Sequence, residues 1–489
     1  MRSTPFFPPF KHMLFGRPPA ALRHILGLQA RCVPLAQYQQ TFGGMVPSGA
    51  LGRSSAGANS RSRLFGPEVS FWAFLAQVLE RGSSCRDALR RVAAWWVLRH
   101  PGRTPPSACS SAYCQARGRL ADNALQQIFD HLADHLERGV RDGQLWKGRS
   151  VKIIDGTTVS MPDTPANQQD WPQHKSQKPG CGFPLLKLVG IFSLASGALL
   201  SVAHGAWRCH ECVLARGLWR LLQPGEILLA DRGFCSFFDI CQLGDRGVDA
   251  LVRLHQARPA DFRRGRRLGK GDRLVEWNKP AQRTRAWSPE EFAALPQSLT
   301  LRMIRYRIAE PGFRSREVVL VTSLLDARTY PLQDIADLYF RRWGVELHFR
   351  QIKTLLGLDV LRCLSPKMVR KELLMHQIAY NLVRALMQRA AATADVDLGR
   401  LSFKGSLDSL HHFADAIYAA SKSRRRQAQL LDALLQTIAA DPVPLRPGRV
   451  EPRARKRRPK NYHLLTRPRH LMHVPPHRNR PKPASLRKA

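Results

Sequence analysis

A long segment with helical periodicity, from about Leu332 to Leu356, constrains this chain more than any other feature. Its apolar residues recur at helical spacing, and only one glycine lies inside it. On a helix with about 100° per residue, four polar side chains share one face: Tyr339, Arg342, Glu346 and Lys353. The ordinary explanation is a solvated face with an Arg342–Glu346 ion pair. A surface that contacts phosphates and holds a metal ion is the alternative, and the rest of the chain favours it.

The charge of the chain indicates a polyanionic partner. Lys and Arg number 77 against 37 Asp and Glu, a net charge of +40, and such an excess favours nucleic acid. No run of about 18 apolar residues predicts a membrane span, and the proline-rich start does not resemble a signal peptide. Ten cysteines without a framework spacing suit a reducing compartment. We therefore expect a nucleoid-associated protein of a bacterial cytoplasm, with no membrane partner.

Composition and periodicity divide the chain into five regions. Residues 1–65 are predicted to be a poorly ordered extension. Residues 66–145 carry helical periodicity with interleaved Arg and Trp, which suits a DNA-binding unit. Residues 146–390 alternate apolar strands and helices, which predicts an α/β domain. Residues 391–441 are predicted to be helical, and 442–489, dense in Arg, Lys and Pro, to be a basic disordered tail.

Two apolar strands of the α/β region are each predicted to end in an acid, Asp155 and Asp231. Acids in such places are costly unless a positive group lies nearby. With Glu346 from the late helix they offer oxygen-only ligands, which favour Mg²⁺ or Mn²⁺ over zinc. Taken singly, each Asp is as readily a turn or N-cap residue. The order of two strand acids, a β-rich insertion at about 256–328 and a helical Glu favours a joint site.

The motifs around these acids resemble a known family. DGTTVSMPDTPAN, LLADRGFCS and the spacing Y-x2-R-x3-E-x6-K are similar to the DDE transposases of the insertion sequence 4 family, over roughly residues 65–469. The resemblance implies a mixed α/β fold: a ribonuclease H-like core with a mixed sheet flanked by helices and interrupted by a β-rich insertion. It also implies that Asp155, Asp231 and Glu346 are catalytic and bind two Mg²⁺ ions, which Mn²⁺ can replace.

The same resemblance implies roles in handling DNA. Residues matching Arg342 and Lys353 contact phosphates at the transposon end, and the residue matching Tyr339 supports that terminus. The implied activity is cut-and-paste transposition by DNA hydrolysis and strand transfer. Its implied partners are double-stranded DNA, as terminal inverted repeats and target, and a second copy of the chain in a homodimeric synaptic complex. A tryptophan of the insertion, Trp277 or Trp287, would handle a flipped base.

Other interpretations remain open. A Cys residue, Cys181, could be a nucleophile, although no His or Asn context supports it. The acids could belong to a stand-alone nuclease or a Holliday-junction enzyme, which would leave the Tyr–Arg–Lys stripe unexplained. A catalytically inactive or domesticated relic would keep the charge and lose the chemistry. A zinc site could form from the motif HGAWRCHEC, through His204, Cys209, His210 and Cys212.

Overall fold

The structure is a computed structural model, and it places part of the predicted N-terminal extension in the core. Tyr38, Phe42 and Met45 are all buried. That part of residues 1–65 is therefore packed, because its large apolar side chains can reach the helical core. Residues 1–37, 40 and 53–63 and most of 442–489 lie outside the described residues. The structure describes residues 38–39, 41–52, 64–100, 102–107, 109–283, 287–308, 317–420, 423–444, 465–468 and 471–472.

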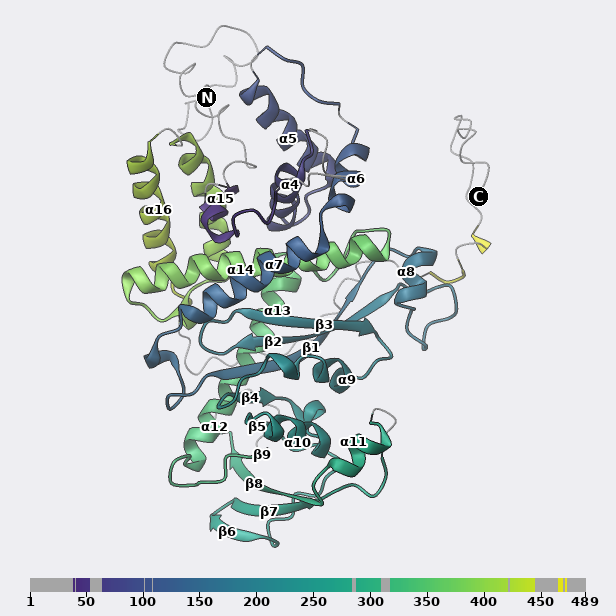
Figure 1. The fold of residues 1–489 in the computed structure, drawn as a ribbon, viewed down its shortest axis with the longest axis vertical. Coiled ribbons are helices and arrows are strands. Elements are labelled where there is room, and N and C mark those ends of the chain that lie inside the picture. Colours follow the sequence, from purple (N-terminus) through teal and green to yellow (C-terminus); the bar gives the residue numbers. More distant parts are fainter. Residues whose placement is uncertain are drawn as a thin grey trace.

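One sheet of nine strands runs through the molecule in the order β3-β2-β1-β4-β5-β9-β8-β7-β6 (Figure 1). In its first five strands only β2 is antiparallel to the others, since β1, β4 and β5 pair in parallel and β3 is antiparallel to β2. This topology is ribonuclease H-like, which confirms the predicted fold class. The five strands are β1 (Val151–Ser160), β2 (Leu185–Ser193), β3 (Leu199–Ala206), β4 (Ile227–Ala230) and β5 (Asp249–Arg253).

The β-rich segment between the second Asp and the late helix continues this sheet. Strand β9 pairs antiparallel with β5, with Leu251 opposite Thr322. The pairing covers an edge of β5 that would otherwise expose its backbone groups. The elements of the segment are β6 (Arg266–Gly269), β7 (Asp272–Asn278), α11 (Pro289–Ala294), β8 (Ser298–Arg307) and β9 (Glu317–Thr322).

Both faces of the core sheet are covered, because successive residues of a strand point to opposite sides. In β1, Ile153 joins the apolar cluster of α7 (Asp122–Arg138) and α14 (Pro366–Ala394). Its neighbour Ile154 joins the other cluster, which includes side chains of α9 (Glu211–Arg216) and α10 (Phe237–Asp245). Residues of β1 are therefore assigned to a face by their position, and this alternation sets the surroundings of Asp155.

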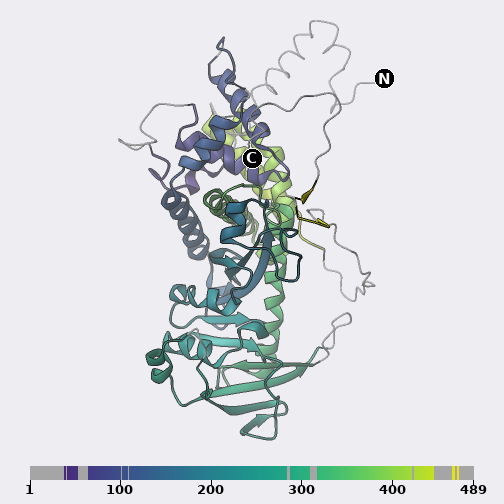
Figure 2. The same ribbon diagram turned by 90° about the vertical axis from the view of Figure 1, so that its right-hand side faces the viewer.

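A group of helices from the two ends of the described chain gathers at one end of the molecule, opposite β6–β9 (Figures 1 and 2). The long helix α14 connects them to the sheet, since it packs against α4, α7, α15 and α16. None of the helices in the described ranges is both long and apolar enough to cross a membrane. The helices of this end are α4 (Pro67–Leu79), α5 (Cys85–Arg99), α6 (Ser111–Arg119), α15 (Phe403–Ala419) and α16 (Arg424–Ala439); α8 (Pro165–Asp170) lies beside the sheet.

Candidate active site

The segment predicted as one helix over 332–356 is helical, but it departs from α-helical geometry at two places. Helix α12 (Leu332–Phe340) passes through a 3₁₀ turn (Arg341–Trp343) into α13 (Gly344–Arg350), and a π-helical turn follows (Gln351–Leu355). Helix α13 packs against β1. A π turn holds more residues than an α turn, so it changes the direction in which the following side chains point. Lys353 lies in this turn, and its direction could not be derived from an ideal helix.

Asp155 lies inside β1, so the prediction that a strand ends there is wrong. Strand β1 continues to Ser160 because β2 pairs with it along almost its whole length. The parallel pairing with β4, however, stops at Ile153. Asp155 therefore lies just beyond the carboxyl end of β4, where Asp231 follows directly. The two predicted acids therefore lie close together at the carboxyl end of this parallel pairing.

The electrostatic surroundings of Asp155 are unbalanced. The pKa of its carboxyl group is raised to about 6, mainly by burial and to a smaller extent by the charges of Asp231 and Glu211. The backbone N–H of Gly156, which donates to Oδ1 at 2.8 Å, and the charge of Arg342 oppose this shift. Arg342 Nη1 lies 3.8 Å from Asp155 Oδ2, a long contact for an ion pair. Asp155 is therefore a carboxylate whose negative charge the protein compensates only in part.

Two side chains of the late helical segment bind this segment to the acid-bearing strands. The buried Tyr339 donates its hydroxyl to the carbonyl oxygen of Ala230 at 3.2 Å, directly before Asp231. Arg342 is buried and makes its ion pair with Asp155 rather than with Glu346 within the described chain. Its Nε is buried and has no hydrogen-bond partner there. The ordinary explanation, a solvated Arg342–Glu346 pair, is therefore wrong, and Arg342 keeps a donor available for an anion.

Lys353 also contacts β1, beyond Asp155. Its Nζ donates to Thr157 Oγ1 and to the carbonyl oxygen of Thr158, both at 2.9 Å. Glu346 is exposed on α13. Over the ranges that the structure describes, no three His, Cys, Asp or Glu side chains lie close enough to hold a metal ion. The structure therefore brings Asp155, Asp231, Tyr339, Arg342 and Lys353 together, and leaves the Glu346 carboxylate outside the pair of acids.

The pair of acids fits a divalent cation by its donor chemistry. Both side chains offer only oxygen ligands, which hard cations such as Mg²⁺ prefer. Asp155 and Asp231 lie side by side, and the contact of Arg342 with Asp155 is long at 3.8 Å, so the ionised pair is compensated only in part. A cation bound between Asp155 and Asp231 would supply that charge.

A further acid, Glu211, was missed in the sequence. Its carboxylate packs against Gly156, since a Cβ on Gly156 would lie 2.6–2.9 Å from the carboxyl atoms of Glu211. Helix α9, which begins with Glu211, also contacts the 3₁₀ turn that follows Asp231. The available signal was an acid at the start of a short helix after β3. The zinc interpretation used its neighbours His210 and Cys212 and left Glu211 out.

The zinc interpretation itself is not supported. The thiol of Cys212 donates to the carbonyl oxygen of Gly233 at 2.9 Å, and that of Cys209 to the carbonyl oxygen of His210 at 3.7 Å. Burial lowers the pKa of His204, whose ring packs against Trp171. These side chains do not converge on a common point, and no described group of three could hold a metal ion.

The remaining candidate side chains are buried. Cys181 is 5% exposed, which does not suit a nucleophile that must reach a substrate. Trp277 is covered by the Arg258 guanidinium, 3.9 Å from its ring centre. Trp287 is packed against Phe238 and is also buried. Neither tryptophan presents its ring to solvent, so neither is poised in this structure to receive a flipped base.

Comparisons with known proteins bear on the same region. The family model of the transposase DDE domain matches residues 146–382, which include Asp155, Asp231, Glu346 and the β-rich segment. The transposase InsG for insertion sequence element IS4 of Escherichia coli K12 is 28% identical over 411 residues, covering 82% of this chain and 88% of InsG. Together these two matches support a DDE transposase of the insertion sequence 4 family.

Two further proteins are similar to this chain. The transposase for insertion sequence element IS421 of Escherichia coli is 27% identical over 271 residues, which cover 49% of this chain and 67% of that protein. A solved structure of the piggyBac transposase synaptic complex with hairpin DNA covers 86% of this chain and 87% of its own, with a TM-score of 0.41 and 11% identity. As a DDE transposase the protein is an enzyme, and its family generally uses divalent metal ions.

Proposed function

We propose that this transposase cuts and joins double-stranded DNA at the inverted repeats of an insertion sequence, with Asp155, Asp231 and Glu346 as its catalytic, metal-binding carboxylates. The observation that carries the proposal is the connection between one helical segment and both acid-bearing strands. Tyr339 binds the residue before Asp231, and Arg342 pairs with Asp155. A partly buried and partly compensated carboxylate beside a buried arginine is the arrangement expected where a cation and a phosphate meet.

The proposed roles follow from the surroundings of each side chain. Asp155 and Asp231 would hold a divalent cation, preferably Mg²⁺, and Glu346 would join them when DNA is bound. Bound metal would activate the attacking oxygen and stabilise the leaving oxygen of an in-line displacement. Arg342 presents an unpartnered Nε, and its planar guanidinium suits phosphate oxygens. Lys353, held against Thr157 and Thr158, places a second positive charge beside the acids.

The assembly is proposed to be a homodimer that holds two DNA ends in a synaptic complex. The net charge of +40 supports DNA as the partner. Hydrolysis would release a 3′-OH at the element end, and the same carboxylates would then serve its attack on target DNA. One site can serve both steps because each is an in-line attack on phosphorus.

The test is cleavage of a labelled DNA fragment that carries the flanking inverted repeat. With Mg²⁺ we expect nicking at the repeat end, and none with EDTA or with Glu346→Gln, Asp155→Asn or Asp231→Asn. The matched control is Asp134→Asn, an exposed acid on α7. Retained DNA binding without cleavage in the native protein would instead identify a catalytically inactive relic. A variant that still cuts would remove its residue from the catalytic set.

Lys353→Ala provides a test of DNA contact that is separate from cleavage. If Lys353 neutralises one phosphate, its loss should weaken binding of the repeat and reduce the salt dependence of log K by about 1. The control is Lys404→Ala, an exposed lysine of α15 that pairs with Asp408. Binding measured by fluorescence anisotropy at several salt concentrations gives the slope. An unchanged slope would count against the phosphate contact.

A further inference from the structure

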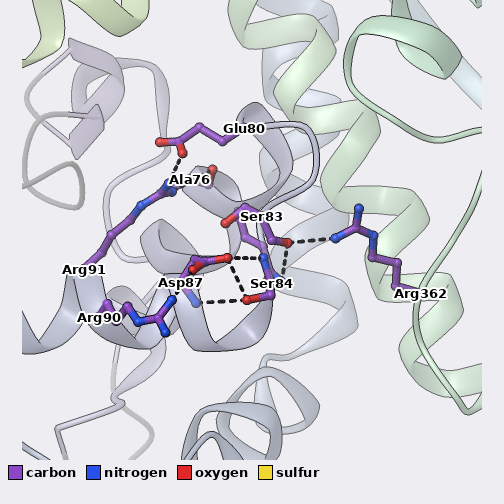
Figure 3. Close-up of polar contacts among 9 residues, drawn as sticks. Ala76, Glu80, Ser83, Ser84, Asp87, Arg90, Arg91 and Arg362 are labelled. Atoms are coloured by element: carbon purple, nitrogen blue, oxygen red, sulfur yellow. Dashed lines mark hydrogen bonds and ion pairs between the residues drawn. The ribbon is translucent and has the colours of Figure 1, made fainter. Parts of the chain in front are cut away.

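A cavity of about 220 Å³ lies between the helical end and the catalytic domain. One wall is the turn between α4 and α5, and the other is the chain from Leu356 to Cys363, directly after the π-helical turn that holds Lys353. Figure 3 shows where the walls meet: Arg362 Nη1 donates to the carbonyl oxygen of Ser83 at 3.0 Å. The capping box of Ser84 and Asp87 holds the α4–α5 turn in place. The cavity is far larger than the roughly 10–15 Å³ that one water molecule needs.

The cavity is lined by positive charge that the protein does not neutralise. Three arginines face it, Arg81, Arg117 and Arg362. Arg117 is only 8% exposed, and its guanidinium contacts Gln77 and the rings of Phe74 and Tyr113. No ion pair of Arg117 with a carboxylate occurs among the described residues, and its Nε is buried without a hydrogen-bond partner. Burying a cation without an anion is unfavourable, so the arrangement favours an anionic ligand.

The groups near Arg117 do not supply a negative charge. Burial raises the pKa of Tyr113, Cys114 and Cys363, so these groups are neutral at pH 7. Glu372 lines the cavity, but its carboxylate accepts the backbone N–H groups of Arg362 and Cys363. The cavity therefore carries three arginines against one carboxylate that is already hydrogen-bonded.

Two further side chains complete the lining. The hydroxyl of Ser83 is buried and has no hydrogen-bond partner among the residues that the structure describes, so its donor is left for a ligand of the cavity. His376 also lines the cavity, and burial lowers its pKa, which leaves it neutral at pH 7. A guanidinium Nε and a hydroxyl that both lack partners are donors that suit the oxygens of a phosphate.

We propose that this cavity binds a phosphate group. The phosphate could come from a DNA phosphodiester or from free phosphate in solution, and both share the chemistry that the arginines and Ser83 recognise. The choice of DNA rests on the proposed function, whereas the phosphate site does not. A ligand here would join the α4–α5 turn to the chain that follows Lys353, and so hold the helical end against the catalytic helices.

The first experiment uses the full chain and inorganic phosphate. Thermal unfolding and calorimetric titration with phosphate, against sodium chloride at equal ionic strength, should show a rise in Tm with concentration and a measurable Kd. Arg362→Ala and Ser83→Ala should weaken phosphate binding at least 5-fold. Arg90→Ala should leave it unchanged, because Arg90 pairs with Asp87 outside the cavity (Figure 3). Arg117→Gln should abolish binding. If this buried variant does not fold, Arg362→Ala and Ser83→Ala still test the proposal.

The second experiment separates the two sources of phosphate. If DNA supplies the phosphate, Arg362→Ala should weaken binding of the repeat several-fold and lower its salt slope by about 1, and free phosphate should compete with DNA. Phosphate binding with unchanged DNA affinity in Arg362→Ala would assign the site to free phosphate. Titration of Glu346→Gln keeps the result independent of cleavage. If phosphate has no effect on the native protein and Arg362→Ala binds DNA normally, the proposal is wrong.

Discussion

Two aspartates of the same sheet, the buried Asp272 and the partly buried Asp155, have opposite surroundings. Asp272 in β7 receives two hydrogen bonds from Arg302, at 2.8 and 2.5 Å, and both side chains are almost fully buried. Asp155 in β1 has one arginine contact at 3.8 Å, and the charges of Asp231 and Glu211 oppose its ionisation. A carboxylate with a complete bidentate partner holds the sheet together. A carboxylate left partly uncompensated is available for a ligand, here a cation.

The largest effect should follow from breaking the complete pair. Asp272→Asn leaves the Arg302 guanidinium buried without a counter-charge, which should cost about 3–5 kcal/mol of unfolding free energy. Urea denaturation followed by circular dichroism measures the loss. The double variant Asp272→Leu/Arg302→Met should recover most of it, because no isolated charge remains. A loss below about 1 kcal/mol in the single variant would contradict the comparison.

At Asp155, removal of the charge should change the unfolding free energy in the opposite direction and stabilise the protein. Its folded pKa of about 6 lies above the ordinary value of 3.8, so the folded protein holds more protons between these values. Stability therefore falls as the pH rises from about 4 to 6, and the full cost remains above that window. In EDTA at pH 8, Asp155→Asn should stabilise the protein by about 1–3 kcal/mol, and at pH 4 the difference should vanish. Equal differences at both pH values would show that Asp155 titrates normally.

Divalent cations provide a second test of the surroundings of Asp155. Mg²⁺ should raise the Tm of the native protein at pH 8, because binding to the folded state alone stabilises it. It should do so less in Asp155→Asn, which lacks one ligand. The measurement needs no DNA and no cleavage, so it tests the metal site apart from activity.

The smallest effect is expected at Glu211. Glu211→Gln removes one of the charges that raise the pKa of Asp155, so that pKa should fall toward its ordinary value. The gain in stability in EDTA at pH 8 should be below about 1 kcal/mol, since a partly exposed pair of charges is well screened. The control is Glu317→Gln, an exposed acid of β9. A stability loss in Glu211→Gln would mean that its carboxylate makes a favourable contact.

The sequence predicted the fold class of the catalytic domain and its late helical segment. The resemblance implied a mixed sheet flanked by helices, and the structure confirms it, with β2 and β3 at one side of the sheet. The helical segment over 332–356 is confirmed as well, although its pitch changes. The sequence pattern placed the end of β1 wrongly at Asp155, because an acid after an apolar run is typical of a strand end. Only the pairing with β2 carries the strand on to Ser160.

What the sequence alone determined here are the properties that depend on neighbours along the chain: the helical stripe, the apolar strands and the excess of positive charge. The tertiary structure decided which groups meet. It placed Arg342 against Asp155 instead of Glu346, put Glu211 beside Gly156, and buried Arg117 without a carboxylate partner in the described chain. The physical reason is range: periodicity and turn chemistry act over a few residues, whereas burial and the interaction between charges depend on segments that only folding brings together.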